Sequence, residues 1–244
     1  MITAFVSDIH ANLAAFQAVL RDMERLRVDT LVCLGDTVGY GPRPAECLDL
    51  MLRRCRISVI GNHDLLAAYY QYRLEGLRED VADGIILARN TVRESDAEAL
   101  RKLPFTLRIG DTTCVHSSLE APAEFPYILS RPDARRHLAQ QSTLCGFFGH
   151  SHVAEAWVQE GRKVRRIQAG EEEIHLVEGA KYAINVGSVG QPRDGDPRAC
   201  YAVYNSHSRT VRWRRVPYDI SVTTRAMASL GMSAFSIERL SLGI

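Results

Sequence analysis

The sequence predicts an α/β fold in which two packed mixed β-sheets are flanked by helices. In the first sixty residues, short apolar runs alternate with helical patterns, as parallel strands joined by crossover helices do. After residue 104, apolar runs follow one another across short turns, which is typical of antiparallel hairpins. No linker or low-complexity tract separates these parts, so we expect one domain over residues 1–244.

The first part contains three short apolar runs, each ending in polar or glycine-rich residues: residues 2–6, 30–34 and 57–60. Between the first two runs, apolar side chains recur at helical spacing on one face: Leu13, Phe16, Leu20 and Met23. Residues 44–54 show a second helical pattern before the third run. The order strand–helix–strand–helix–strand predicts parallel strands with right-handed crossovers.

The middle of the chain, residues 63–103, has a helical pattern that we expect Gly76 and Gly84 to break. The remaining strands are expected at residues 105–109, 112–115, 143–148, 154–159, 163–168, 174–177, 182–186, 200–204 and 210–216. From Ser221 onward the pattern indicates one or two helices. Strands followed by helices complete the expected α/β layering.

Charge and composition count against two classes of partner. The 30 Lys and Arg balance 29 Asp and Glu, so the net charge of +1 favours neither nucleic acid nor an anionic membrane. The N-terminus lacks a basic segment, and no run reaches the 18 or so apolar residues of a membrane span. The six cysteines form no CxxC pair and predict buried free thiols. We therefore expect a cytoplasmic protein, with its oligomeric state left open.

Histidines and carboxylates gather at the expected strand ends, where ligands bind in open α/β sheets. Five of the eight histidines lie in these segments: Asp8-Ile9-His10, Gly35-Asp36, Gly61-Asn62-His63-Asp64, His116 and Gly149-His150-Ser151-His152. Each fragment alone has an ordinary explanation, such as a helix cap, a turn or a partly buried histidine. Together they form a nitrogen and oxygen ligand set without thiolate, suited to Mn²⁺, iron, Zn²⁺ or Mg²⁺.

In this order, the motifs resemble those of the calcineurin-like metallophosphoesterase superfamily. The stretches at residues 35–42 and 187–195 resemble a prokaryotic branch of small single-domain members. The resemblance implies that Asp8, His10 and His152 hold one divalent ion. It further implies a second ion on Asn62, His116 and His150, with Asp36 bridging the two. Mn²⁺ is the expected metal, with iron, Zn²⁺, Ni²⁺ and Mg²⁺ as alternatives.

The same resemblance implies hydrolysis of a phosphoester by in-line attack of a hydroxide that bridges the two ions. His63 matches a histidine that faces the substrate without binding metal, and it would protonate or stabilise the leaving oxygen. Asp64 is expected to favour the protonated form of His63; the alternative is a plain surface carboxylate.

Two departures from family patterns affect the expected substrate. The phosphoprotein phosphatase branch has Gly-Asp-x-x-Asp-Arg-Gly in its second motif, whereas this chain has Gly39 and Tyr40 in place of the second Asp and the Arg. The phosphoprotein phosphatase hypothesis therefore loses two functional groups. Ser117 and Ser118 follow His116, where many relatives have glycine first, so the neighbouring substrate wall is not defined by the resemblance.

Three residues near the motifs are weaker candidates for substrate binding. Asn12 opens a helix whose amides could bind phosphate, or it is an ordinary N-cap. Arg193 could pair with phosphate, or it is a solvated loop charge. Tyr40, with Phe125 and Tyr127, could form an aromatic surface for a base or phenyl ring; core or rim packing is the alternative.

The sequence thus predicts a two-metal hydrolase of a small phosphomonoester or phosphodiester, with nucleotides among the candidates. A nuclease is the second enzyme hypothesis, and the absence of an evident basic stripe counts against it. Two further hypotheses are a phosphoprotein phosphatase and a non-catalytic scaffold of the same fold. The complete ligand set counts against a scaffold, because scaffolding does not require seven metal-binding side chains.

Overall fold

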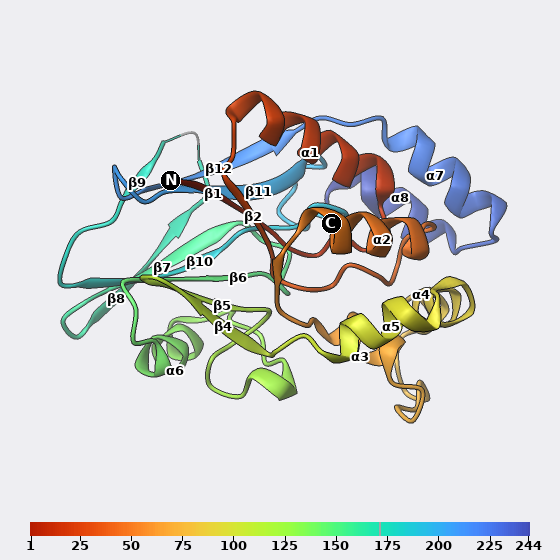
Figure 1. The fold of residues 1–244 in the computed structure, drawn as a ribbon, viewed down its shortest axis with the longest axis horizontal. Coiled ribbons are helices and arrows are strands. Elements are labelled where there is room, and N and C mark those ends of the chain that lie inside the picture. The colour runs from red at the N-terminus through yellow and green to blue at the C-terminus, as the bar shows by residue number, and fades with distance from the viewer. Residues whose placement is uncertain (171) are drawn as a thin grey trace.

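The computed structural model describes residues 1–170 and 172–244, and it contains two six-stranded mixed sheets with helices around them (Figure 1). The first sheet has the order β3-β2-β1-β11-β12-β9, and the second has the order β4-β5-β6-β10-β7-β8. The predicted fold class is therefore confirmed.

The strands of the first sheet are β1 (Ile2–Val6), β2 (Thr30–Cys33), β3 (Ile57–Ser58), β9 (Ile174–His175), β11 (Ala199–Asn205) and β12 (Thr210–Val216). Those of the second are β4 (Thr106–Ile109), β5 (Thr112–Val115), β6 (Cys145–Phe148), β7 (Glu155–Glu160), β8 (Lys163–Gln168) and β10 (Ala180–Asn185). The α-helices are α1 (Leu13–Leu26), α2 (Pro44–Arg54), α3 (Asn62–Ala68), α4 (Glu79–Thr91), α5 (Glu94–Arg101), α6 (Arg131–Gln140), α7 (Ile220–Ser229) and α8 (Ala234–Leu242), with a 3₁₀ turn at Pro122–Glu124.

The first three strands pair in parallel, β1 with β2 and β2 with β3, and α1 and α2 form the crossovers as predicted. The apolar positions of α1, including Phe16, Leu20 and Met23, are buried against this sheet. Because parallel strands end at the same edge, the segments after β1, β2 and β3 emerge side by side. The predicted motifs start at this edge.

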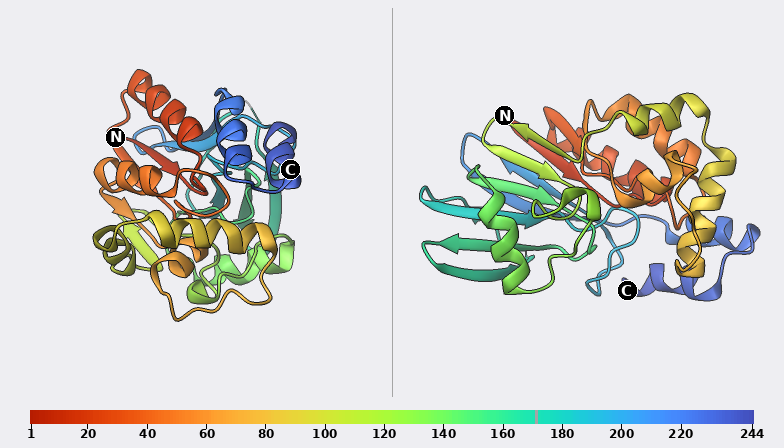
Figure 2. Two further views of the ribbon diagram at one scale, coloured as in Figure 1. Left: turned by 90° about the vertical axis from the view of Figure 1, so that its right-hand side faces the viewer. Right: turned by 90° about the horizontal axis from the view of Figure 1, so that it is seen from below.

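The two sheets pack face to face, with Phe5 of β1 stacked on Phe147 of β6 at 3.8 Å between ring centroids. The rest of this layer contains aliphatic side chains, the aromatic residues Tyr182, Tyr204 and Trp213, and the cysteines Cys114, Cys145 and Cys200. Burial of each large apolar side chain contributes about 1.5–3 kcal/mol. Figure 2 shows the strands gathered at one end of the molecule and most helices at the other, with the motif-bearing strand ends between them.

One expected helix break is wrong. Gly76 lies in the connection between α3 and α4, as predicted, but Gly84 lies inside α4, and this helix ends instead at Val92, which is extended. A Cβ at Gly84 would lie 2.2 Å from the Tyr40 amide nitrogen. Glycine is present because α4 packs directly against the backbone at Tyr40.

All six cysteines are buried and unpaired, as the sequence predicts. Within the described residues, no helix is long and apolar enough to cross a membrane.

Candidate metal centre

Five of the predicted ligands turn the backbone sharply just after strands. Each has a left-handed conformation: Asp8 (φ 53°), His10 (φ 45°), Asp36 (φ 54°), His150 (φ 66°) and His152 (φ 61°). Asp and His tolerate this region better than most residues. The turns after β1, β2 and β6 thereby direct carboxylates and imidazoles into one buried cluster, in which these five residues are at most 7% exposed.

Asp8, His10 and His152 bring one donor atom each within 4.8 Å of one another. The Nε2 atoms of His10 and His152 are 3.0 Å apart, and Asp8 Oδ1 is 3.3 Å from His152 Nε2. Two ligands that lie at right angles about 2.1 Å from one ion are about 3 Å apart. The spacing of this group therefore suits a shared ion.

Asp36, His116 and His150 form a second such group. Asp36 Oδ2 is 3.3 Å from His116 Nε2 and 3.7 Å from His10 Nε2, so it faces both groups. The backbone amide of His150 donates to Asp8 Oδ2 over 2.9 Å, which ties the two groups together. Asn62 is the first residue of α3, and its Oδ1 is buried.

The orientation of three imidazoles is fixed by backbone carbonyls. The Nδ1 atoms of His10, His116 and His152 face carbonyl oxygens, at 3.0, 2.8 and 2.6 Å, of Val38, Leu34 and Gln191 respectively. A carbonyl only accepts, so each Nδ1 carries the proton and each Nε2 can offer a lone pair. This is the tautomer that metal coordination through Nε2 requires.

Several inward-facing donor atoms have no hydrogen-bond partner within the described residues. These buried atoms are Asp8 Oδ1, Asn62 Oδ1, His116 Nε2 and His150 Nε2. Buried polar atoms are nearly always satisfied, and leaving one without a partner costs about 1–3 kcal/mol. Two divalent cations would satisfy all four, so the residues fit a pair of metal ions.

Carboxylates and imidazoles in the centre shift one another's pKa values. Burial alone would raise the pKa of Asp36, but the imidazoles of His116 and His63 reverse this and hold it well below its usual value. Burial likewise opposes the charged form of His116, yet Asp36 raises its pKa to about 9. A metal ion that binds His116 must displace the proton from Nε2, so metal binding should weaken as the pH falls.

His63 lies beside the two groups, with a ring nitrogen within 4.8 Å of donor atoms of His10 and Asp36. Its backbone amide donates to Asp36 Oδ1 over 2.8 Å, and its Nδ1 is buried. The ring packs against Tyr40 at 4.6 Å and against His10 at 4.7 Å between centroids. The position is close enough to both a bound substrate and the metals for either role, but burial lowers the pKa of His63 to about 3, which opposes the expected protonated form.

Asp64 is fully buried, so the surface-carboxylate alternative is wrong. Its carboxylate accepts hydrogen bonds from the backbone amides of Thr37 and Val38, at 2.9 and 3.2 Å, and from Gly61 at 3.4 Å. Burial and the charge of Asp36 raise the pKa of Asp64 to about 7. The contacts indicate that Asp64 joins the turn after β2 to the start of α3.

Gly39 explains why the phosphoprotein phosphatase motif is absent. A Cβ at this residue would lie 2.3 Å from His63 Nδ1, and φ at Gly39 is +90°. The acidic side chain of that motif therefore has no space here, because the His63 ring occupies it.

Of the weaker candidates, Asn12 has its amide fully engaged. Its Nδ2 donates to the Gly190 carbonyl and the Tyr218 hydroxyl, at 2.9 and 3.0 Å, and its Oδ1 accepts from Ala15 N and Thr223 Oγ1. The structure favours the N-cap interpretation of Asn12 over substrate contact.

Arg193 lies close to the first group, since its amide donates to the His152 carbonyl over 3.1 Å. Its guanidinium donates to Gln191 Oε1 over 2.7 Å and lies 5.5 Å from the Tyr40 ring, with Nε buried and without a hydrogen-bond partner in the described chain. Tyr40 itself is 9% exposed and packs against His10 and His63. Tyr40 is therefore packed beside the ligands, as the alternative of core or rim packing predicts.

Phe125 and Tyr127 lie against the second group. The Tyr127 ring stacks on His150 at 4.0 Å, and the Phe125 ring is 5.9 Å from His116. The predicted aromatic surface is therefore divided, with Tyr40 at one group and the other two rings at the second.

Sequence reasoning missed Ser188 and Arg239. Ser188 Oγ donates to the Asp8 carbonyl over 2.8 Å, and it lies in the 187–195 stretch that carried part of the resemblance. Arg239 of α8 is 5% exposed, and burial followed by repulsion from Arg193 lowers its pKa to about 10. No sequence pattern pointed to Arg239, because the helical pattern after Ser221 does not show which distant residues the last helix packs against.

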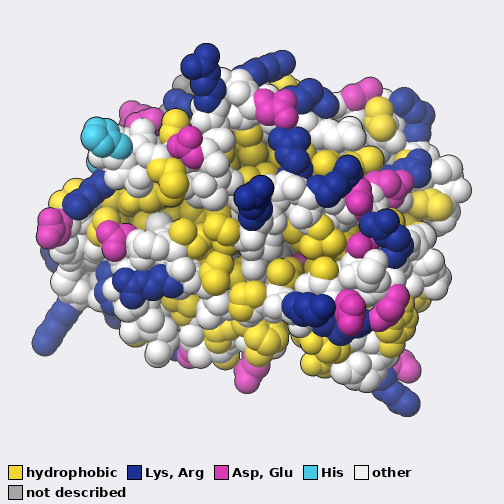
Figure 3. Space-filling model, in the orientation of Figure 1, with side chains coloured by type: hydrophobic (Ala, Val, Ile, Leu, Met, Phe, Trp, Pro, Cys, Tyr) yellow, Lys and Arg dark blue, Asp and Glu magenta, His cyan; other side chains and the backbone are white. Residues whose placement is uncertain are grey.

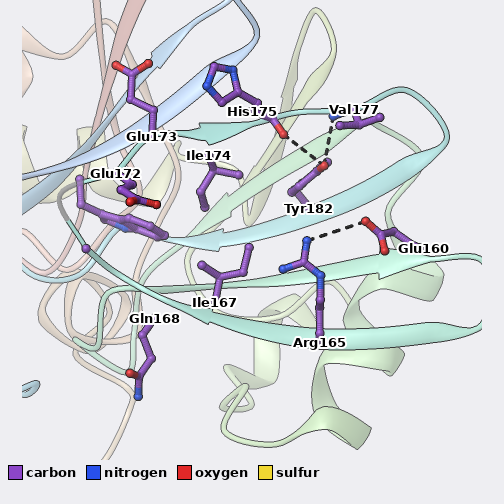
Figure 4. Close-up of a pocket in the computed structure, with 12 residues that line it drawn as sticks. Glu160, Arg165, Ile167, Gln168, Glu172, Glu173, Ile174, His175, Val177 and Tyr182 are labelled. Atoms are coloured by element: carbon purple, nitrogen blue, oxygen red, sulfur yellow. Dashed lines mark hydrogen bonds and ion pairs between the residues drawn. The ribbon is translucent and has the colours of Figure 1, made fainter.

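A separate cavity of about 410 Å³ opens near β8 and β9, away from the candidate ligands (Figure 4). The Tyr182 hydroxyl bonds there to the Val177 amide and the His175 carbonyl, and Arg165 faces Glu160 at 3.8 Å. The Tyr182–His175 bond joins β10 of the second sheet to β9 of the first, whereas Arg165 and Glu160 belong to neighbouring strands of the second sheet. None of the predicted site residues lines the cavity.

Comparisons with known proteins agree with this fold. A crystal structure of a metallophosphoesterase from Sphaerobacter thermophilus is 35% identical and superposes with a TM-score of 0.89, covering 100% of this chain and 99% of that one. An uncharacterized protein of Methanocaldococcus jannaschii is 32% identical over 244 residues, covering 98% of this chain and 97% of the relative. A symmetrical bis(5'-nucleosyl)-tetraphosphatase of Acidovorax ebreus is 38% identical over 103 residues, 37% of this chain and 34% of that protein.

The model of the calcineurin-like phosphoesterase superfamily domain matches residues 1–209, a span that includes every predicted metal ligand. The match continues through Arg193 and the 187–195 loop, whereas α7 and α8 lie beyond it. With the fold, the donor set and this match in agreement, the chain belongs to the calcineurin-like phosphoesterase superfamily.

Proposed function

We propose that the chain is a phosphoester hydrolase that uses two divalent metal ions and acts on a small phosphomonoester or phosphodiester. One observation carries the proposal: two groups of donor atoms, several of them buried without partners, converge from both sides on Asp36. A non-catalytic scaffold has no need of buried ligand atoms without hydrogen-bond partners, because each such atom destabilises the fold. Binding of metal ions removes that cost.

Asp8, His10 and His152 would hold one ion, and Asn62, His116 and His150 the other, with Asp36 between them. When bound, the two ions supply Lewis acidity that activates water and neutralises phosphoryl oxygens. Mn²⁺ is our proposed metal, since the donors are nitrogen and oxygen only; iron, Zn²⁺, Ni²⁺ and Mg²⁺ remain alternatives.

Other residues would act on the substrate directly. His63, beside Asp36 and packed on Tyr40, is placed to give a proton to the leaving oxygen. Arg193, fixed to His152 through its backbone, can pair with a phosphoryl oxygen. Asp64 positions His63 indirectly, by holding the start of α3 against the turn after β2.

The alternative of a nuclease has less support. Figure 3 shows basic and acidic side chains interspersed over the visible face, in keeping with a net charge of +1. Phosphate-backbone binding normally needs a continuous basic surface. The similarity to a tetraphosphatase named for nucleosyl substrates favours a small nucleotide over a nucleic acid.

The test combines metal analysis with a substrate panel. The purified protein should contain or take up close to two divalent ions per chain, and it should hydrolyse an aryl phosphate ester in Mn²⁺. Nucleoside monophosphates, cyclic nucleotides and dinucleotides would then rank the physiological class. A protein that binds two ions but hydrolyses no member of the panel in any of the five metals would contradict the proposal.

A further inference from the structure

Tyr127 is exposed although it lies on a buried metal-ligand candidate. Tyr127 is 49% exposed, whereas His150, on which the tyrosine ring lies, is 7% exposed. The two rings stack at 4.0 Å between centroids with an interplanar angle of 17°. Tyr127 thus covers one imidazole of the second donor group and still offers aromatic surface to solvent.

The same connection, between β5 and α6, presents two more apolar side chains. Leu129 is 63% exposed, and Phe125 has a left-handed backbone with φ of 51°. Phe125 lies 5.9 Å from His116 and 6.4 Å from His150 between ring centroids. Left-handed aromatic residues are strained, and such strain concentrates at functional sites. Exposed apolar surface beside a buried polar pocket is a common mark of ligand binding.

A cation lies beside the first donor group, away from Tyr127 at the second. Arg193 is joined to His152 of the first group and stacks over Tyr40. The donor groups therefore have an aromatic side at Tyr127 and a cationic side at Arg193.

We propose that Tyr127, supported by Phe125, binds a planar aromatic ring of the substrate by stacking, so that the preferred esters are nucleotides or aryl esters. This inference rests on the proposed hydrolase function and names its substrate class. Arg193 and the metals take the phosphate, which places the ring of the ester at the second donor group. Stacking of a base on an aromatic side chain strengthens binding about 5- to 100-fold.

The test measures a ratio of specificities. Adenosine 5'-monophosphate and ribose 5-phosphate share the scissile group, and only the first has a base. Tyr127→Ala should lower kcat/KM for the nucleotide about 5- to 100-fold and change that for ribose 5-phosphate less than about threefold. Tyr127→Phe should behave like the wild type, because it keeps the ring. Tyr70→Ala, at an exposed tyrosine after α3 (56% exposed), is the matched control.

Metal content is measured in every variant, since loss of Tyr127 could also disturb His150. Equal losses on the two substrates would overturn the stacking role, and a Tyr127→Phe loss as large as that of Tyr127→Ala would assign the effect to the hydroxyl.

A second readout needs no catalysis. Saturation-transfer NMR with adenosine alone should detect the base on the wild type and not on Tyr127→Ala. If the wild type hydrolyses no ester, the proposed function fails, whereas the NMR comparison still decides whether Tyr127 binds an aromatic ring.

Discussion

The Asp36 carboxylate lies between one histidine of each donor group, with Oδ2 3.7 Å from His10 Nε2 and 3.3 Å from His116 Nε2. Its other oxygen accepts the His63 amide over 2.8 Å, which fixes the carboxylate in this orientation. A single oxygen that faces both groups is what a bridge between two cations requires.

Asp36→Asn should therefore lose metal as well as turnover, because a neutral amide bridges two cations poorly. Changes at residues that only support metal ligands cost about 10- to 100-fold, so we expect a loss of at least about 100-fold in turnover. Elemental analysis and an aryl ester assay measure both effects. Retention of two ions at a near-normal rate would show that Asp36 is not the bridge. Asp83→Asn, at an exposed aspartate of α4, is the control for the same chemical change elsewhere.

His63→Ala should keep both metals and lower turnover about 10²- to 10⁴-fold, the scale of general acid catalysis. The loss should be larger for an alkyl ester than for a nitrophenyl ester, because nitrophenolate departs without protonation. Metal content and both rates are measured on wild type and variant. Equal losses would leave only electrostatic stabilisation to His63, and loss of an ion would make it a ligand.

Gly84→Ala should destabilise the protein although alanine is the better helix former by about 1 kcal/mol. The added methyl would lie 2.2 Å from the Tyr40 amide, so α4 must move, at a cost of about 1–3 kcal/mol. Urea unfolding measures the change. Gly170→Ala is the control, because a Cβ there meets no atom of the described part of the chain within 4 Å. A Gly84→Ala protein as stable as the wild type would refute the close packing.

Asp22→Asn should give a pH-dependent loss of stability. Asp22 accepts hydrogen bonds from Arg214, at 2.9 and 3.1 Å, and from the Tyr201 hydroxyl at 2.8 Å. Burial would raise its pKa, but Arg214 and then Tyr201 lower it below the ordinary value. A lowered folded pKa stabilises the protein above the unfolded value of about 4, and the effect disappears as pH falls through the folded value.

At pH 7 the wild type should therefore exceed Asp22→Asn by about 1–3 kcal/mol in the free energy of unfolding, and the difference should shrink below about pH 4. Urea titrations at pH 7, 5 and 3 measure it. A difference that stays constant across this range would exclude a titrating Asp22.

The sequence was most informative where chemistry follows a strand. Runs such as residues 2–6 and 30–34 predict parallel strands, and parallel strands end together, so the sequence alone places Asp8 and Asp36 in one site. Where a residue such as Asn12 had both a capping and a substrate-binding interpretation, the sequence could not decide between them. Asn12 caps its helix through the nearby Ala15 amide, but the partners that occupy its side-chain nitrogen and leave it none for a substrate are Gly190 and Tyr218, which are 178 and 206 residues away along the chain.

The same limit explains the other differences. Glycine inside α4 is required by contact with Tyr40, which is a tertiary cause that helix propensity does not contain. Asp64 became a buried acceptor of backbone amides because the turn after β2 meets α3. Arg239 reaches the vicinity of Arg193 only through the packing of the last helix.

The left-handed turns at the ligands lower the stability of the fold, and the same residues are needed for activity. Five of the candidate ligands adopt this conformation, and each costs about 1–2 kcal/mol relative to a relaxed backbone. Glycine would relieve the strain at any of them and remove a donor in the same step. Selection for thermal stability alone should therefore enrich variants with glycine at Asp8, His10 or His152, and these variants should be stable but inactive. Stabilisation of this fold without loss of function has to come from positions outside these turns.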